Sequence, residues 1–222
     1  MPGDGKEILA DGVANAGLVV RIGDEVRRPA SARRSTVHAF LRRLHAQGFD
    51  GVPMPVGSPA VDEDGRERLE FIPGEVPLPP YPAWAQTDRA LASVARLLRR
   101  FHDASRLSGA GSAGSTDLWS DELADPSCGP DDEILVCHND VCLENVVFSD
   151  GEAVALLDLD FAAPGRPLYD LAQLARTCAP VDDPLSAAPE FVAMWQEMGG
   201  MARFDRRRAW FAEIRETLGR DL

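Results

Sequence analysis

The sequence contains one lysine, Lys6, among its 222 residues, so arginine supplies nearly all of its positive charge. No apolar run approaches the roughly 18 residues that a membrane-spanning helix needs. The first residues, MPGDGKEILADG, have neither the charged nor the apolar region of a secretion signal. We therefore expect a cytoplasmic protein without a membrane partner.

Cysteine is scarce, and its spacing argues against a disulfide framework or a structural metal. The four cysteines are Cys128, Cys137, Cys142 and Cys178, and no CxxC pair occurs. In a reducing compartment we expect free thiols. A zinc site built from Cys137, His138 and Cys142 is the alternative, and the spacing rules for zinc ligands disfavour it.

The formal net charge of −13 is distributed unevenly along the chain. Residues 1–75 contain 10 basic and 12 acidic residues, whereas residues 76–222 contain 13 and 24. Such a chain should repel nucleic acid, so we expect no nucleic-acid partner. The acidic second half could attract a cationic small molecule by electrostatic steering, or it could simply keep the protein soluble.

The first third of the sequence reads as strands with one helix. Residues 17–29 predict two short strands joined by a turn at Gly23. Residues 35–47 predict a helix, with Ser35 as its N-cap, and residues 52–72 predict further strands. The Pro-rich stretch that follows places a lobe boundary near residue 75.

The remainder reads as helices around a small hairpin. The expected elements are a helix at 86–104, a loop at 105–130 with room for one short helix, a hairpin of 146–148 with 154–157, a helix near Asp170, and helices within 185–220. We therefore expect two parts, residues 1–75 and residues 76–222.

The stretch LVCHNDVCLENVVFSDGEAVALLDLDF, residues 135–161, places many polar groups between two apolar strands. The polar loop 138–145 enters the predicted hairpin, and Asp158 stands at its exit. The two ends of a hairpin lie side by side. We therefore expect Asp140, Asn145 and Asp158 to converge.

Such a set suits phosphoryl transfer, which needs metal ions to neutralise phosphate charge and a carboxylate to orient the attacking hydroxyl and accept its proton. Magnesium prefers hard oxygen ligands, which Asn and Asp provide. Asp140 is the candidate base, and Asn145 and Asp158 are the candidate ligands of Mg²⁺.

Two ordered motifs carry a family resemblance. HNDVCLEN resembles the HxDxxxxN catalytic loop of protein kinases and aminoglycoside phosphotransferases. LLDLDFAAPGRPLYDLAQLA resembles the IDF…G…DLA segment of the aminoglycoside phosphotransferase and choline kinase families. The close match covers about residues 137–175.

The resemblance implies an α+β, bilobal, protein-kinase-like fold. Its small N-terminal lobe, residues 1–75, would be a β-sheet with one helix that binds nucleotide. Its mainly helical C-terminal lobe, residues 76–222, would hold the catalytic and substrate sites.

The resemblance also suggests roles for further residues. His138 would support the catalytic loop through hydrogen bonds, with general-base action as the minority alternative. Asp160 would either touch a second metal or face solvent. Asp170 would brace the loop backbone, and a plain N-cap is the alternative. Cys142 reads as a small filler.

The N-terminal half departs from the family pattern. Kinase-like enzymes hold the phosphates with a lysine that pairs with a glutamate on the following helix. Arg28 is the best substitute for the lysine because it shares a strand face with Val26, and Arg27 is the alternative. His38 stands where the glutamate is expected, so we expect the usual ion pair to be absent. The alternative for His38 is an ordinary, partly exposed side chain.

Other nucleotide contacts are predicted by position. Glu70, Phe71 and Ile72 fit the hinge between the lobes, whose backbone would pair with the purine. The segment GVANAG resembles a degenerate phosphate-covering loop.

The acceptor site is less defined. About fifty residues follow Asp170, including Trp195 and Trp210, which could line a pocket or form core. A second copy of the chain, in a homodimer, could complete such a pocket.

The favoured function is an ATP- or GTP-dependent kinase that phosphorylates a hydroxyl of a small, aminoglycoside-like molecule. The alternative is a pseudokinase-like module that binds nucleotide or ligand without transfer, which the missing lysine and glutamate favour. A thiol hydrolase based on Cys137 or Cys142 with His138 is a third, weaker reading.

Overall fold

The computed structural model describes residues 6–9, 18–79, 81–110, 117–129 and 131–178. The predicted phosphate-covering loop, the helices within 185–220 and the two tryptophans of the suggested acceptor pocket lie outside these residues. No helix in the described ranges is long and apolar enough to cross a membrane.

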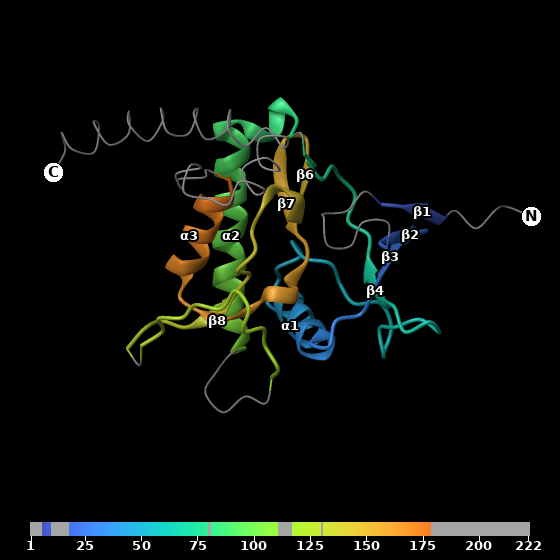
Figure 1. Cartoon of the computed structure of the whole chain (residues 1–222), viewed down its shortest axis with the longest axis horizontal. Helices are drawn as coiled ribbons and strands as arrows, with labels where there is room; N and C mark the ends of the chain where they lie inside the picture. Colours follow the sequence, from blue (N-terminus) through green and yellow to red (C-terminus); the bar gives the residue numbers. More distant parts are fainter. Residues whose placement is uncertain (1–5, 10–17, 80, 111–116, 130, 179–222) are drawn as a thin grey trace, which may run out of the picture.

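The N-terminal part is a four-stranded antiparallel sheet in the order β1-β2-β3-β4 (Figure 1). The strands are β1 (Lys6–Ile8), β2 (Val20–Ile22), β3 (Glu25–Arg28) and β4 (Glu67–Glu70). Gly23, at φ 63°, allows the predicted tight turn between β2 and β3. The β3–β4 register sets Arg28 directly opposite Glu67, which places the two side chains on one face of the sheet.

Helix α1 (Arg34–Ala46) follows β3. Its predicted apolar positions, Val37, Phe40, Leu41 and Leu44, are all buried. The N-cap is Arg33, so the assignment of Ser35 as the cap is wrong. The chain already turns into the helix at residues 32–33, which leaves Ser35 inside the first turn.

The segment after β4 crosses to the second part of the molecule beside a strand of the hairpin. Glu75 exchanges two backbone hydrogen bonds of 2.8 Å with Phe148. Gly74 has φ 151°, and a Cβ added there would lie 2.5 Å from the Phe148 carbonyl oxygen. This close approach requires glycine and fastens the crossing segment to the hairpin.

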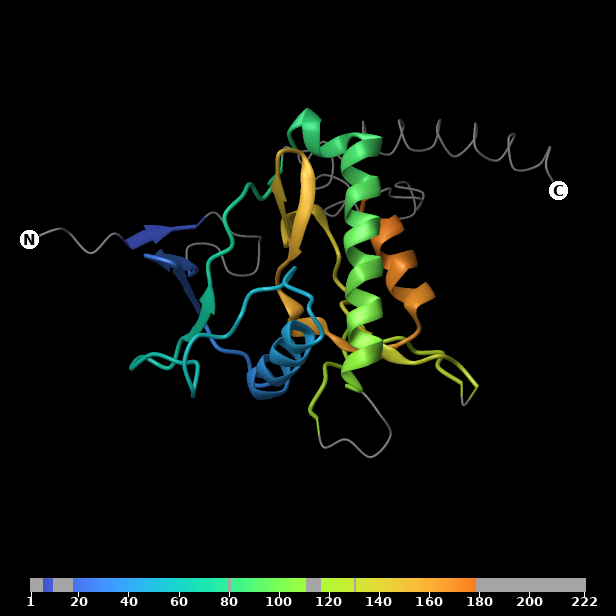
Figure 2. The ribbon, with the colours of Figure 1, turned by 180° about the vertical axis from the view of Figure 1, so that it is seen from behind.

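Helix α2 (Asp88–Ser108) runs along the second part and is preceded by the short helix η1 (Ala83–Gln86). The Thr87 side chain caps its start by accepting a hydrogen bond from Ala90, and Gly109 ends it in the left-handed conformation. The helix therefore extends beyond the predicted 86–104. Figure 2 shows α2 lying between the hairpin and α3.

The remaining elements surround the motif-bearing stretch. They are β5 (Leu135–Cys137), η2 (Leu143–Asn145), β6 (Val146–Ser149), β7 (Glu152–Leu156), η3 (Leu159–Phe161), β8 (Ala163–Gly165) and α3 (Pro167–Cys178). Strands β6 and β7 form the predicted hairpin, and β5 pairs with β8. Helix α3 begins three residues before Asp170, so the N-cap alternative for this aspartate is wrong.

The core joins the two parts. Phe40 of α1 packs edge-to-face on Phe101 of α2, with ring centroids 5.9 Å apart, and both rings are fully buried. Val136, Val146 and Leu156 from the strands complete this contact region. The loop 138–145 is thus held between a helix-packed core and the hairpin.

Candidate active site

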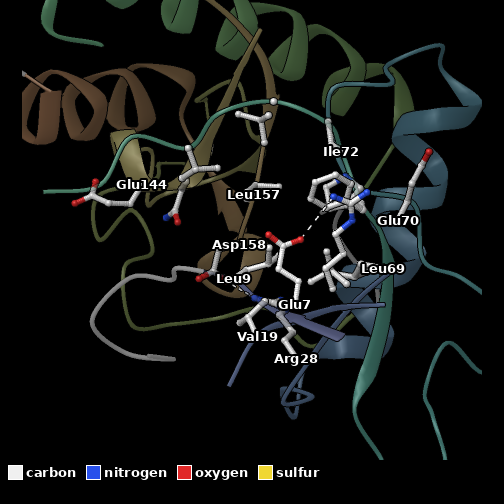
Figure 3. Close-up of a pocket in the computed structure, with 18 of the residues that line it drawn as sticks. Glu7, Leu9, Val19, Arg28, Leu69, Glu70, Ile72, Glu144, Leu157 and Asp158 are labelled. Carbon is white, nitrogen blue, oxygen red and sulfur yellow. Dashed lines mark hydrogen bonds and ion pairs between the residues drawn. The ribbon is translucent and has the colours of Figure 1, made fainter. Parts of the chain in front are cut away.

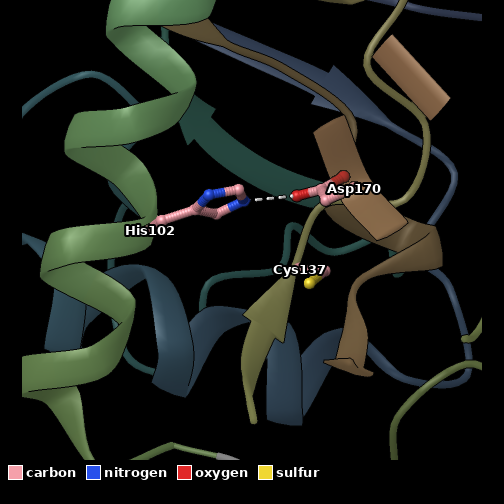
Figure 4. A group of neighbouring side chains, drawn as sticks. All are labelled: His102, Cys137 and Asp170. Atoms are coloured by element: carbon pink, nitrogen blue, oxygen red, sulfur yellow. Dashed lines mark hydrogen bonds and ion pairs between the residues drawn. The ribbon is translucent and has the colours of Figure 1, made fainter. Parts of the chain in front are cut away.

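The loop after β5 is anchored by a buried aspartate on α3. The Asp170 carboxylate accepts hydrogen bonds from the backbone N–H groups of His138 and Asn139, each at 2.9 Å. It also accepts from His102 of α2 at 2.8 Å, as Figure 4 shows. Burial raises the pKa of Asp170, but the His102 hydrogen bond and the loop donors reverse this, and its pKa is lowered. The carboxylate stays ionised while it fixes the start of the loop.

His138 is fully buried, and both ring nitrogens have partners. Its Nε2 lies 2.8 Å from the carbonyl oxygen of Leu157, and its Nδ1 lies 3.3 Å from the backbone nitrogen of Asp140. An Nε2–H donor with an Nδ1 acceptor satisfies both contacts. This arrangement gives His138 a supporting role and leaves it no free nitrogen to act as a base.

Asp140, near the start of the loop, and Asn145, at its end, are joined by hydrogen bonds. The Asn145 amide donates to the Asp140 backbone oxygen at 2.9 Å and to its carboxylate at 3.0 Å. Burial and the nearby Asp158 carboxylate raise the pKa of Asp140, against the lowering influence of His138 and Asn145. A half-buried carboxylate with a raised pKa is a suitable proton acceptor.

The backbone of Leu157 brings Asp158 beside the loop. Its N–H donates to the Asn145 carbonyl oxygen at 2.8 Å, while its own carbonyl oxygen contacts His138. Asp158, in the left-handed conformation at φ 57°, follows at the exit of β7. Asp140, Asn145 and Asp158 therefore lie on two adjacent, hydrogen-bonded segments.

Arg28 of β3 reaches this group from the sheet. Its Nη1 bonds Asp158 at 2.7 Å, its Nη2 bonds Asp160 at 2.8 Å, and its Nε bonds Glu67. Arg27, the alternative, points elsewhere and pairs with Glu25 and Asp62. The alternation of side chains along β3 thus selects Arg28.

Arg28 has a carboxylate partner, although helix α1 contains no glutamate to supply it. Glu67, its cross-strand neighbour on β4, supplies the carboxylate, and His38 of α1 contacts the second Glu67 oxygen at 2.7 Å. His38 is 5% exposed, so the alternative of an ordinary, partly exposed side chain is wrong. Burial raises the pKa of Glu67, but His38 and Arg28 reverse this and lower it.

Sequence reasoning missed Glu67, although the pattern ERLE contained a signal. In a strand, alternate residues share a face, so Glu67 lies on the same side as Leu69. A glutamate on the buried face of a strand needs a cationic partner. His102, which holds Asp170, carried a similar signal on the apolar face of α2.

A pocket of about 440 Å³ opens between the sheet and the hairpin. Val26 and Leu69 of the sheet and Val19 just before β2 line it on one side, and Val147 and Leu157 of the hairpin segment line it on the other. Figure 3 shows Val19, Leu69 and Leu157 among the residues around the pocket. Its volume lies within the range of small-molecule sites. Arg28, Asn145 and Asp158 form its polar end.

The predicted hinge residues Glu70, Phe71 and Ile72 also line this pocket. The N–H groups of Glu70 and Phe71 are already bonded to the carbonyl oxygens of Met54 and Asp24. The Ile72 N–H has no acceptor among the described residues. Arg21 stacks on the Phe71 ring, 3.7 Å from its centroid.

A second group of possible metal ligands is His102, Cys137 and Asp170, whose ligand atoms lie within 4.8 Å of one another. Figure 4 shows the histidine turned towards the aspartate. Burial raises the pKa of Cys137 strongly, so its thiol stays protonated, and Asp170 is engaged by the loop. Both oxygens of Asp170 already accept hydrogen bonds from the loop and from His102, so these residues form a structural cluster.

The same reasoning applies to the loop thiol. Burial also raises the pKa of Cys142, which disfavours the thiolate. Cys137, His138 and Cys142 do not form a metal-ligand cluster among the described residues. These observations argue against both the zinc site and the thiol hydrolase.

The oxygen atoms at the polar end of the pocket are of the kind that binds a magnesium ion. The Asn145 amide nitrogen is used by Asp140, and its Oδ1 has no hydrogen-bond donor in the described part of the chain. Asp158 contributes a carboxylate on the neighbouring segment. These hard oxygen donors match the ligand preference of Mg²⁺.

Two comparisons by sequence relate the chain to known proteins. The sequence profile of the phosphotransferase enzyme family matches residues 9–126 and 116–210. A curated relative, the trifolitoxin immunity protein of Rhizobium leguminosarum bv. trifolii, is 35% identical over 155 residues. That alignment covers 70% of this chain, and the chain spans only 56% of the relative's length.

Solved structures show the same fold at low identity. A choline/ethanolamine kinase family protein from Mesorhizobium loti is 17% identical with a TM-score of 0.52, covering 94% of this chain and 89% of its own. An amicoumacin kinase, solved with AMP-PNP and Ca²⁺, is 14% identical with a TM-score of 0.58, covering 94% and 73%. The chain belongs to the phosphotransferase enzyme family and has its α+β, protein-kinase-like fold.

Proposed function

We propose that the protein transfers the γ-phosphate of ATP or GTP to a hydroxyl group of a small molecule. The observation that carries this proposal is that Asn145 and Asp158 line the polar end of a 440 Å³ pocket, while Asn145 holds the Asp140 carboxylate by a hydrogen bond of 3.0 Å. Membership of the phosphotransferase enzyme family supports the reaction class.

Asp140 is the proposed base. The Asn145 amide holds its carboxylate in place, and its raised pKa favours proton uptake. The acceptor hydroxyl would give its proton to Asp140 while its oxygen bonds the γ-phosphorus. The bond from that phosphorus to the β–γ bridging oxygen then breaks, and the nucleoside diphosphate leaves.

Asn145 and Asp158 are the proposed ligands of Mg²⁺, with Asp160 as a candidate for a second ion. When bound, the metal would neutralise the charge of the phosphates. His138 and Asp170 would keep the loop that carries Asp140 and Asn145 in one conformation.

The nucleotide would lie in the pocket with its base at the hinge and its phosphates at Arg28. The apolar walls suit a purine ring, and the Ile72 N–H is the hinge donor that remains for the base. Arg28 would contact the phosphates in place of the family's lysine, because a guanidinium binds phosphate oxygens in pairs.

A cationic, aminoglycoside-like acceptor is favoured by charge. Glu144 lies in the loop beside Asp140 and is bonded to Tyr81, and both acidic loop residues would attract a cation. The name of the curated relative, an immunity protein against trifolitoxin, is consistent with protection by modifying an antibiotic. A second copy of the chain could complete the acceptor pocket.

One observation favours the alternative, a module that binds nucleotide or ligand without transfer. Arg28 occupies oxygens of Asp158 and Asp160, the groups that a catalytic metal would need. Transfer to an acceptor separates the two functions, because a binding module would bind nucleotide and release no diphosphate.

The first test is calorimetric titration with ATP and GTP, with and without Mg²⁺, followed by an acceptor screen for diphosphate release. We expect magnesium-dependent binding that Asp158→Ala abolishes and Cys142→Ala preserves. Binding without transfer to any acceptor would favour the binding module. No binding of either nucleotide at millimolar concentration would reject the nucleotide-dependent function.

A further inference from the structure

Arg28 bonds three carboxylates at once, and two of them belong to the proposed metal site. Its guanidinium contacts Asp158 at 2.7 Å and Asp160 at 2.8 Å, while its Nε contacts Glu67. The arginine side chain is 10% exposed, and the two metal-site aspartates are each 29% exposed. A cation is therefore fixed against the oxygens that a metal ion would use.

Glu67 and His38 hold this cation from behind. The register of β3 and β4 makes Arg28 and Glu67 direct neighbours, and His38 takes the remaining oxygen of Glu67. An arginine guanidinium is not deprotonated in proteins. The guanidinium thus stays charged and keeps its outer edge towards Asp158 and Asp160.

We infer that Arg28 excludes free divalent cations from Asp158 and Asp160, and that a polyphosphate lifts this exclusion, so that metal enters only together with nucleotide. The second half of this inference rests on the proposed function. The first half concerns the protein and the metal alone.

The exclusion follows from charge. A fixed guanidinium repels an incoming divalent ion and already occupies one oxygen of each aspartate, and such repulsion is strong at short range in a partly buried site. A phosphate chain acts in the opposite direction, because a guanidinium has five N–H donors and the three carboxylates use three of them. Two donors remain for phosphate oxygens, whose binding would draw the charge of Arg28 away from the aspartates.

The test is Mn²⁺ binding measured by electron paramagnetic resonance, with manganese alone and then with ATP present. The variants are Arg28→Gln, which removes the charge, and Arg28→Lys, which keeps it. Arg27→Gln is the matched control, because Arg27 lies one residue away on the same strand and contacts neither Asp158 nor Asp160.

We expect weak binding of Mn²⁺ alone to the natural protein and binding at least about tenfold tighter to Arg28→Gln. With ATP the order should reverse, so that Arg28→Gln binds the manganese–nucleotide complex more weakly. Arg28→Lys should stay close to the natural protein in binding Mn²⁺ alone, and Arg27→Gln should match it in both measurements. An Arg28→Gln variant that binds Mn²⁺ alone equally or more weakly would overturn the inference, because Arg28 would then only organise the site.

Loss of Arg28 alone leaves Glu67 without its cationic partner, which could impair folding. The double variant Arg28→Gln/Glu67→Gln removes both charges of the buried pair, which is far less destabilising than removing one. Its binding of Mn²⁺ alone should also exceed that of the natural protein. If neither ATP nor GTP binds any variant, the proposed function fails, yet the comparison with manganese alone still decides whether Arg28 excludes the metal.

Discussion

Asp140 lies in the loop 138–145, and Asp170 of α3 holds the start of that loop. The more deeply buried of these two aspartates has the lower pKa, although burial alone would raise it. Asp170 is fully buried and has a lowered pKa, whereas Asp140 is half-buried and has a raised pKa. Asp170 accepts hydrogen bonds from two backbone N–H groups and from His102. Asp140 accepts one side-chain hydrogen bond, from Asn145, and lies near the like charge of Asp158.

The comparison shows that the number of donors, more than depth, decides whether a buried carboxylate is stable as an anion. Asp170 is suited to hold the loop as an anion at neutral pH. Asp140 is suited to take up a proton. Four predictions test this division of roles.

The largest effect is expected for catalysis. Asp140→Asn should lower the rate of phosphate transfer by about 10²–10⁴-fold, the usual contribution of a general base. The measurement is diphosphate release with an identified acceptor, at saturating nucleotide. Nucleotide affinity should change little, because the substitution keeps the size of the side chain. Unchanged turnover would remove Asp140 from the mechanism.

The next effect is on folding stability. Asp170→Asn should lower the free energy of unfolding by about 2–4 kcal/mol at pH 7, because its amide cannot accept from all three donors. The measurement is urea denaturation. The folded-state pKa of Asp170 lies below its ordinary value of 3.8, so its stabilisation is complete above that value and is lost as the pH falls through the lower, folded pKa.

The difference between Asp170→Asn and the natural protein should therefore shrink in acid below about pH 4. A difference that stayed constant down to pH 2 would mean that the charge of Asp170 has no part in its bracing role.

A smaller loss should follow when one donor is removed. His102→Leu should lower the free energy of unfolding by about 1–3 kcal/mol, because it removes the side-chain donor of Asp170 and leaves the two backbone donors. Denaturation compared with Asp170→Asn and the double variant measures the coupling between the two residues. Fully additive losses would show that the 2.8 Å contact carries no stabilisation of its own.

The smallest effect should have the opposite sign. Since the folded-state pKa of Asp140 is raised, the folded protein binds a proton more tightly than the unfolded chain, and stability falls as the pH rises through that range. Asp140→Asn lacks this penalty and should be more stable at pH 7, by less than about 1 kcal/mol after solvent screening. Thermal unfolding measures it, and a clear destabilisation would contradict the assignment.

The sequence predicted the elements that depend on local pattern. The helix face of Val37, Phe40, Leu41 and Leu44, the turn at Gly23 and the hairpin of β6 and β7 follow from periodicity and turn chemistry. Helix ends were less predictable, because Arg33 replaces Ser35 as a cap and Gly109 stops α2 later than expected. These ends depend on tertiary packing as well as on local propensity.

The sequence by itself predicted that Asp140, Asn145 and Asp158 converge, because they flank a predicted hairpin and a hairpin returns its two ends to one place. The partners of Arg28 were decided only by the tertiary structure. Glu67 stands 39 residues away from Arg28, and Asp158 stands 130 away. Strand register and the packing of α1 bring these charges together, and no local pattern encodes contacts over such separations.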